Sequence, residues 1–175
     1  NILNKIDFEK LLSSKEIIKK INSRNEISFK SKKFSRIRVD EFNSKIDIAY
    51  GRLNFRKIFI IGKNDFECSG LINMFEELPL LDFDCKVSVE DKKKFLKIFQ
   101  INYKIKDEVF NLHVNGNISI LSNKIAFKNI KTNKYEASRE DLKYFKDVFE
   151  NVLYNKSFLD IFDTKKIRNF ILEIS

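Results

Sequence analysis

The sequence predicts an α+β fold in which a largely antiparallel β-sheet presents one continuous apolar face. Apolar and polar residues alternate with a period of two through about seven successive segments in the middle of the chain. Helical periodicity is confined to the two ends and one short interruption, unlike the regular alternation of a βαβ protein. We therefore expect short N-terminal helices over 1–24, the sheet over 25–135 with an embedded helix over 91–100, and a C-terminal helical tail over 136–175.

The first 24 residues carry two short apolar stripes at helical spacing, separated by Ser13 and Ser14, which suit a helix cap. The stripes comprise Ile6, Phe8, Leu11 and Leu12, followed by Ile17, Ile18 and Ile21. Helices this short are marginal in isolation, so they need a surface to pack against.

The first strands of the sheet meet at a predicted tight turn. Their apolar positions change from even to odd numbers at Gly51 and Arg52. A two-residue hairpin turn with glycine first produces such a change. The pairs expected across it are Tyr50 with Leu53 and Ile48 with Phe55.

The two cysteines are predicted to face each other across a hairpin. Residues 66–72 and 81–89 both alternate, and Pro79 lies in the loop between them. The expected pairs are Ile72 with Leu81, Gly70 with Phe83, Cys68 with Cys85, and Phe66 with Val87. Facing cysteines on one sheet face can be close enough to form a disulfide. The alternative is two buried free thiols that act as small hydrophobic side chains.

A long alternating strand over 110–120 contains Asn115-Gly116, a dipeptide typical of hairpin turns. We reject a turn there, because an uninterrupted strand keeps every apolar side chain on one face. The turn is expected instead at Ser122-Asn123. It would pair Ile120 with Ile125 and Ile118 with Phe127.

The tail is predicted to hold two amphipathic helices. Ser138 is expected to cap the first, and Asp163 or Thr164 the second. Their apolar stripes are Leu142, Phe145, Phe149, Val152 and Leu153, and then Ile167, Phe170, Ile171 and Ile174.

Candidate catalytic groups are sparse, and we expect neither enzymatic activity nor a cofactor. The chain has no GxGxxG, P-loop, GxSxG or HExxH motif. Its single histidine, His113, falls opposite the apolar face and is interpreted as solvated. Asp82 and Asp84 share one strand face, where they could act as paired acids or simply contact solvent. With Glu90 they are a weak candidate for metal ligation, and no metal site is expected.

The chain is basic, with a formal net charge of +9. One acid-free run holds five cations, namely Lys30, Lys32, Lys33, Arg36 and Arg38. Phe29 and Phe34 are interleaved with it, but alternation sends Phe29 and the lysines to opposite faces, so a base-stacking platform is not favoured. Nucleic acid is therefore an unlikely partner. Lys, Asn, Ile and Phe, which have AT-rich codons, make up about half of the chain, and this weakens the inference from charge.

Three segments resemble the C-terminal region of AsmA-like proteins, bacterial relatives of the bridge-like lipid transfer proteins. They read RVDEFNSKIDIAYGRLNFRKIFIIG, FECSGLINMFEELPLLDFDCKVSVEDKKKFLKIF and FNLHVNGNISILSNKIAFKNI. FDCKVSVEDKKKFLKIF is similar to the family's strand followed by a short helix, and VNGNISILSNKIAFKNI to its next pair of strands. The resemblance covers roughly residues 25–135 and a helical tail.

The resemblance implies a non-enzymatic lipid-binding or lipid-transfer segment of a Gram-negative cell envelope. Family members are anchored in the inner membrane, extend into the periplasm and are thought to carry phospholipid toward the outer membrane in an apolar groove. The resemblance implies that the sheet of this chain is likewise curled, with its apolar face as the wall of a groove. The sequence starts at Asn1 and shows no signal peptide or membrane-spanning run, so we expect a soluble piece of a longer protein whose anchor lies upstream. Its partners would be phospholipid or another acyl lipid, and a membrane reached through that anchor.

The side chains expected to contact lipid lie on the apolar face of the sheet. They are Phe66, Ile72, Leu81, Phe83, Val87, Val89, Phe110, Leu112, Val114, Ile118, Ile120, Ile125 and Phe127. Two alternatives stay open, a basic nucleic-acid-associated domain and a structural or interaction module whose own helices cover the sheet.

Overall fold

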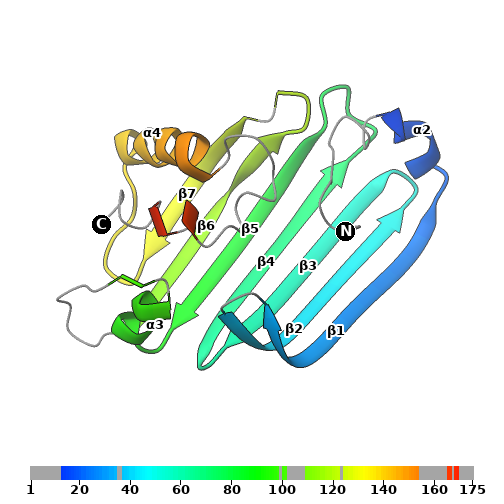
Figure 1. The fold of residues 1–175 in the computed structure, drawn as a ribbon. Coiled ribbons are helices and arrows are strands. Elements are labelled where there is room, and N and C mark those ends of the chain that lie inside the picture. The colour runs from blue at the N-terminus through cyan, green and yellow to red at the C-terminus, as the bar shows by residue number, and fades with distance from the viewer. Residues whose placement is uncertain are drawn as a thin grey trace.

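The computed structural model describes residues 13–34, 37–98, 100–101, 109–122, 124–153, 165–166 and 168–169. Within them, seven strands form one open antiparallel sheet in chain order (Figure 1). The strands are β1 (Asn22–Phe34), β2 (Ile37–Ala49), β3 (Arg52–Ile61), β4 (Asn64–Asn73), β5 (Leu80–Val89), β6 (Phe110–Ser119) and β7 (Ile125–Thr132). The helices are α2 (Lys15–Ile18), α3 (Lys92–Ile98) and α4 (Arg139–Val148), which continues into the π-helical turn η2 (Phe149–Leu153). The predicted α+β class, with mostly antiparallel β structure, is confirmed.

The strand register gathers apolar side chains on one face of the sheet. One row of directly paired residues crosses six strands, from Ile48 through Leu53, Ile72, Leu81 and Ile118 to Ile125. The residues between them along each strand point to the other face, because side chains alternate along a strand. That second face carries ion pairs such as Arg24–Asp47 and Arg56–Glu67.

One cluster of buried residues lies at one end of the apolar face, while Val89, Leu96 and Ile101 are buried at the end of β5 and around α3. The core cluster consists of Ile18, Ile72, Met74, Leu81, Ile118, Ile120 and Ile125. Ile18 comes from α2, and the partly buried Phe149 of η2 packs against the cluster. Fully burying such side chains stabilises the fold by about 1.5–3 kcal/mol each. This end of the sheet is therefore closed by the protein itself.

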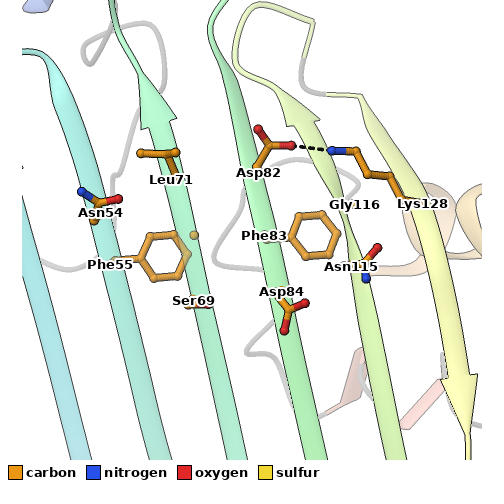
Figure 2. A pocket seen from close by; sticks show the side chains of 11 residues that line it. Asn54, Phe55, Ser69, Leu71, Asp82, Phe83, Asp84, Asn115, Gly116 and Lys128 are labelled. Atoms are coloured by element: carbon orange, nitrogen blue, oxygen red, sulfur yellow. Dashed lines mark hydrogen bonds and ion pairs between the residues drawn. The ribbon is translucent and has the colours of Figure 1, made fainter.

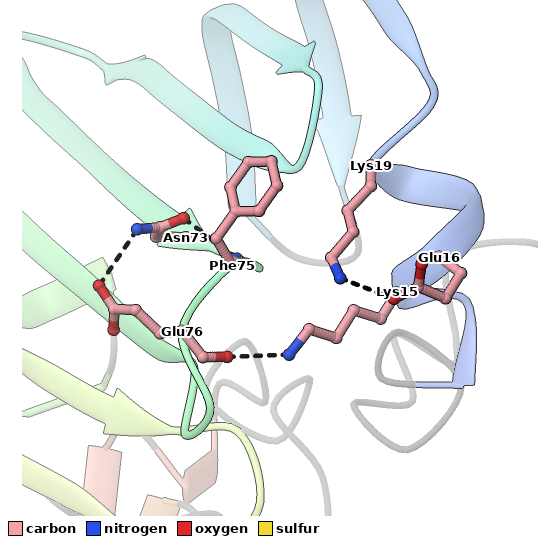
Figure 3. A network of polar contacts seen from close by, with 6 residues as sticks. All are labelled: Lys15, Glu16, Lys19, Asn73, Phe75 and Glu76. Atoms are coloured by element: carbon pink, nitrogen blue, oxygen red, sulfur yellow. Dashed lines mark hydrogen bonds and ion pairs between the residues drawn. The ribbon is translucent and has the colours of Figure 1, made fainter.

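Helix α2 is fixed to the loops at that end of the sheet (Figure 3). The Gly51 amide donates to the Ile18 carbonyl at 3.2 Å, and Lys15 Nζ donates to the Glu76 carbonyl at 2.9 Å. Lys19 Nζ lies 5.8 Å from the centre of the Phe75 ring and pairs with Glu16 at 2.6 Å. Ser14 occupies the N-cap position without a cap hydrogen bond from its side chain. The helix has four residues, so these tertiary contacts hold it in place.

Two further helices flank the sheet (Figure 1). Helix α3, predicted over 91–100, begins at Lys92, and its Phe95 ring lies 5.7 Å from that of Phe66 on β4. Helix α4 lies beside β7, and Ser138 caps it as predicted, in a capping box with Asp141. Residues 165–166 and 168–169 are helical, but the other residues of the predicted last helix, and the stripe over 6–12, lie outside the described residues.

The predicted pairing across the β2–β3 turn was wrong by two residues. The observed pairs are Ile48 with Leu53 and Ile46 with Phe55, and the turn residues are Tyr50 and Gly51. Both have positive φ, 45° and 91°, as a type I′ turn requires. Glycine therefore occupies the second turn position, where the sequence analysis had placed it first.

The predicted pairing across the β6–β7 turn was wrong in the same way. Ile118 pairs with Ile125, and Gly116 pairs with Phe127. Ile120 is not part of the strand, although it is buried in the turn at 1% exposure. The register shifts beside Asn115 and Gly116, so that Lys128 has no opposite residue, which is a β-bulge. The bulge brings both Phe127 and Ile130 to the apolar face.

The predicted β4–β5 hairpin is confirmed in every pair. Ile72 faces Leu81, Gly70 faces Phe83, Cys68 faces Cys85, and Phe66 faces Val87. Strand β6 is continuous through Asn115 and Gly116, so the decision against a turn there is confirmed as well.

Candidate functional site

The candidate site is the part of the apolar face that lies away from the core cluster, over β1 to β4. A row of phenylalanines crosses these strands, in which Phe29 pairs with Phe42 and Phe59 pairs with Phe66. The ring centres are 4.9 Å apart in the first pair and 4.5 Å apart in the second, and both pairs are stacked. At the edge of the same face, Ile27 is 61% exposed. This region is apolar but only partly covered.

A second row alternates phenylalanine with glycine. Across β3 to β7 it reads Phe55, Gly70, Phe83, Gly116 and Phe127. A Cβ atom on Gly70 would lie 2.5 Å from Cε1 of Phe55, and one on Gly116 would lie 2.9 Å from Cζ of Phe83. Each phenylalanine ring therefore lies against the backbone of the next strand. That position must be glycine, because a Cβ atom would occupy the space of the ring.

The thirteen predicted lipid-contacting residues divide into two groups. Twelve lie on strands and share the apolar face, and Ile120 lies in the β6–β7 turn. Six are buried by the protein itself, namely Ile72, Leu81, Val89, Ile118, Ile120 and Ile125. The half-buried group is Phe66, Phe83, Val87, Phe110, Leu112, Val114 and Phe127. Only the second group is accessible to a ligand without displacing the core.

The apolar face of β1 to β3 was not among the predicted lipid-contacting residues. Phe29, Phe42, Ile46, Phe55 and Phe59 are half-buried there and continue the same face. Their alternation was readable in the sequence, so the omission came from restricting the site to the later strands.

A polar pair interrupts this face. Ser44 of β2 is directly opposite Lys57 of β3, and Lys57 is opposite Cys68 of β4. Burial lowers the pKa of the Lys57 ammonium below its usual value of 10.5. Its Nζ lies 5.6 Å from the centre of the Phe55 ring. By parity, Lys57 belongs to the apolar face, and this signal was present in the sequence but not used.

Cys68 and Cys85 are joined by a disulfide in the middle of the same face. Their Cα atoms are 4.1 Å apart and the S–S distance is 2.00 Å. The bond links β4 to β5 across a sequence separation of 17 residues. It is in the same row of side chains as Ser44 and Lys57.

The opposite face carries polar side chains and several ion pairs. An open depression of about 540 Å³ lies on it, bordered by Asp82, Asp84 and Lys128 (Figure 2). Asp82 pairs with Lys128 at 2.8 Å, and the Asp84 carboxylate accepts a hydrogen bond of 2.7 Å from Nε2 of His113. Each carboxylate is thus held by its own partner, so the two do not form the shared acid pair that general acid–base chemistry uses.

The described residues give little support for a metal site or a nucleic-acid interface. Among the described residues, no group of three or more histidine, cysteine or acidic side chains is placed to hold a metal ion. Glu90 pairs with Lys63 at 3.3 Å instead of joining Asp82 and Asp84. In the basic run, Lys30 pairs with Glu41 at 3.7 Å, and the side chains of residues 31–38 are outside the description.

No family model matches the chain, and no curated protein and no solved structure matches it significantly. The described part of the chain includes no helix with the length and apolar character needed to cross a membrane.

Proposed function

We propose that this chain is a non-enzymatic lipid-binding or lipid-transfer segment of an AsmA-like cell-envelope protein. Its sheet would act as a groove whose apolar face holds the acyl chains of phospholipid or of another acyl lipid. The observation that carries the proposal is the half-buried phenylalanine row of β1 to β4, Phe29, Phe42, Phe59 and Phe66, which lies outside the core cluster. A partly covered apolar surface of this extent is typical of a binding surface.

The energetics of acyl-chain binding suit such a face. Burial of a methylene group contributes about 0.8 kcal/mol and requires no directional partner. Alternating apolar side chains on neighbouring strands give a continuous surface along which a flexible chain can lie. The scarcity of candidate catalytic groups is consistent with a function that makes and breaks no covalent bond.

The proposal includes a periplasmic location, an inner-membrane anchor outside this segment and a role in outer-membrane biogenesis. The disulfide between Cys68 and Cys85 supports an oxidising compartment, because cytosolic thiols are kept reduced. The anchor and the outer-membrane role depend on the resemblance to AsmA-like proteins alone.

A second candidate is a structural or interaction module whose helices cover its own sheet. It is favoured by the six predicted contact residues that the core already buries, including Ile72, Leu81 and Ile118. Contacts from α2, α3 and η2 reach the apolar face at both ends of the strands. The two candidates differ in whether the middle of the face holds a ligand.

Native mass spectrometry of gently purified protein tests the proposal. Copurified phospholipid supports the proposal, and copurified nucleic acid indicates the basic-domain alternative. If the protein shows only its own mass after incubation with phospholipid vesicles, the self-covered module is favoured. Val87→Glu places a charge on the apolar face of β5, and Lys86→Glu changes the adjacent exposed residue on the other face. Loss of lipid in Val87→Glu alone is expected, with folding of both variants checked by circular dichroism. Equal lipid loading in the two folded variants would contradict the groove.

A further inference from the structure

The only charged side chain at the centre of the apolar face, within the described residues, is Lys57. Its neighbours along β3 on that face are Phe55 and Phe59. Its direct partners across the sheet are Ser44 and Cys68, the latter bonded to Cys85. A lysine in such surroundings is costly unless something compensates its charge.

Among the described residues, no carboxylate or hydrogen-bond acceptor compensates this charge. Lys57 forms no ion pair or hydrogen bond with any described residue. Its ammonium group makes a cation–π contact with Phe55, whose ring centre lies 5.6 Å from Nζ. On this face of β2, the nearest carboxylate belongs to Asp40, four residues from Ser44 and so about 13 Å along the strand. Asp40 accepts a hydrogen bond from the Gly62 amide at 2.7 Å. By contrast, Lys30, Lys45 and Lys128 pair with carboxylates on the polar face.

Ser44 is a second, independent anomaly at the same place. It is 5% exposed, yet its hydroxyl makes no hydrogen bond with a described residue. Buried polar groups are satisfied in the great majority of cases, so an unsatisfied one requires an explanation. One hydroxyl donor and one ammonium, adjacent on neighbouring strands, form a matched pair of donors for the two oxygens of a small monoanion.

We infer that Ser44 and Lys57 bind the carboxylate of a long-chain fatty acid whose acyl chain lies along the phenylalanines of β1 to β4. The inference rests on the proposed lipid-binding function and names the ligand class. A carboxylate is favoured over a phosphodiester because the remaining neighbours, Phe42, Phe55 and the disulfide, offer nothing polar to a glycerol or headgroup. Ammonium–carboxylate bonds of this kind are short, about 2.7–2.9 Å, and stronger than neutral hydrogen bonds.

Isothermal titration calorimetry with dodecanoate and dodecanol tests the inference, because the two ligands share a chain and differ in charge. The wild-type protein is expected to bind dodecanoate about tenfold more tightly than dodecanol. Lys57→Met should remove this preference by weakening dodecanoate alone, and Lys57→Arg should retain it. The matched control is Lys86→Met, on the other face of the sheet, which should change neither affinity.

The other outcomes separate this inference from the proposed function. Equal affinities that Lys57→Met leaves unchanged would show acyl-chain binding without carboxylate recognition, which overturns the inference and leaves the groove. Lys57-dependent binding of phosphatidylglycerol vesicles without binding of dodecanoate would identify a phosphodiester site and overturn the fatty acid. Binding of none of the three lipids would overturn the proposed function and the inference together.

Discussion

The ring of Phe55 lies over Gly70 on the neighbouring strand, so closely that a Cβ atom on Gly70 would be 2.5 Å from Cε1 of the ring. The same relationship recurs one strand pair later, where Phe83 lies over Gly116. Large rings fit on one face of a continuous sheet here because every second position in the row lacks a side chain. The glycines are thus part of the apolar surface and not weak points in the strands.

Adding a methyl group at Gly116 should destabilise the fold strongly. Its Cβ would lie 2.3 Å from the backbone oxygen of Ala126, which cannot move without breaking the β6–β7 pairing. We expect Gly116→Ala to lower the free energy of unfolding by about 2–3 kcal/mol, measured by urea denaturation. Gly70→Ala should lower the free energy of unfolding by less, because the closest contact of the added Cβ atom is the side chain of Phe55. The Asp82 carbonyl, 2.9 Å from that Cβ atom, limits how far the structure can relax.

Gly62→Asn is the control for these glycine substitutions. Gly62 has φ of +63°, which asparagine tolerates, and nothing lies within 4 Å of a Cβ atom there. We expect a change within about 0.5 kcal/mol. Wild-type stability in Gly116→Ala would show that β7 can shift away and would contradict the close approach of the strands.

The faces of the strands could be predicted from the sequence, but two of the registers could not. A shift of two residues in a hairpin keeps every side chain on the same face, so the apolar pattern is equally satisfied by Ile48 opposite Leu53 or opposite Phe55. Turn geometry decides between them, and it depends on the backbone of Tyr50, whose positive φ is uncommon for a bulky residue. The β4–β5 register was predictable because it brings Cys68 to Cys85.

The bulge and the polar pair had signals that the sequence analysis did not use. Phe127 and Ile130 are apolar at odd and even positions of one strand, and this change of parity indicates an inserted residue. Lys57 falls between Phe55 and Phe59 in the alternation. The alternation of residues along β3 cannot show that Lys57 has no counter-ion among the described residues. That depends on which residues the fold brings near Lys57.

Replacing Tyr50 should stabilise the protein. Tyr50 is 59% exposed and adopts φ of 45° in the turn before Gly51, a conformation that asparagine tolerates well. We expect Tyr50→Asn to raise the free energy of unfolding by about 0.5–1 kcal/mol, seen as a higher midpoint in thermal denaturation. Gly51→Ala should have the opposite effect, because its φ is 91° and a Cβ atom would lie 2.9 Å from the Phe75 ring. A loss of stability in Tyr50→Asn would contradict the assignment of the turn.

Removing the charge of Lys57 should also stabilise the ligand-free protein. Methionine keeps the length of the side chain and adds apolar surface, so we expect Lys57→Met to gain about 1 kcal/mol.

Because burial holds the pKa of Lys57 in the folded state below 10.5, the unfolded chain binds more protons between these two values. The cost of the charge is therefore complete below the folded-state pKa and declines as the pH rises through it. Urea denaturation at several pH values should show the largest gain near neutral pH and a smaller one toward pH 10.5. A gain that grows with pH would contradict a lowered pKa.

Removing the disulfide should lower stability without changing the arrangement of the strands. The bond joins residues separated by 17 positions, and closing a loop of about this length contributes roughly 3 kcal/mol in the chain-entropy model. Thermal denaturation of a variant with Cys68→Ser and Cys85→Ser should show a corresponding loss, and dithiothreitol should lower the midpoint of the wild type but not of the variant. The flanking pairs, Gly70 with Phe83 and Phe66 with Val87, retain their ladder, so circular dichroism of the folded variant should be unchanged.

Thiol titration of denatured wild-type protein from its native compartment should find no free thiol. Two free thiols there would contradict the bond and remove its support for an oxidising compartment.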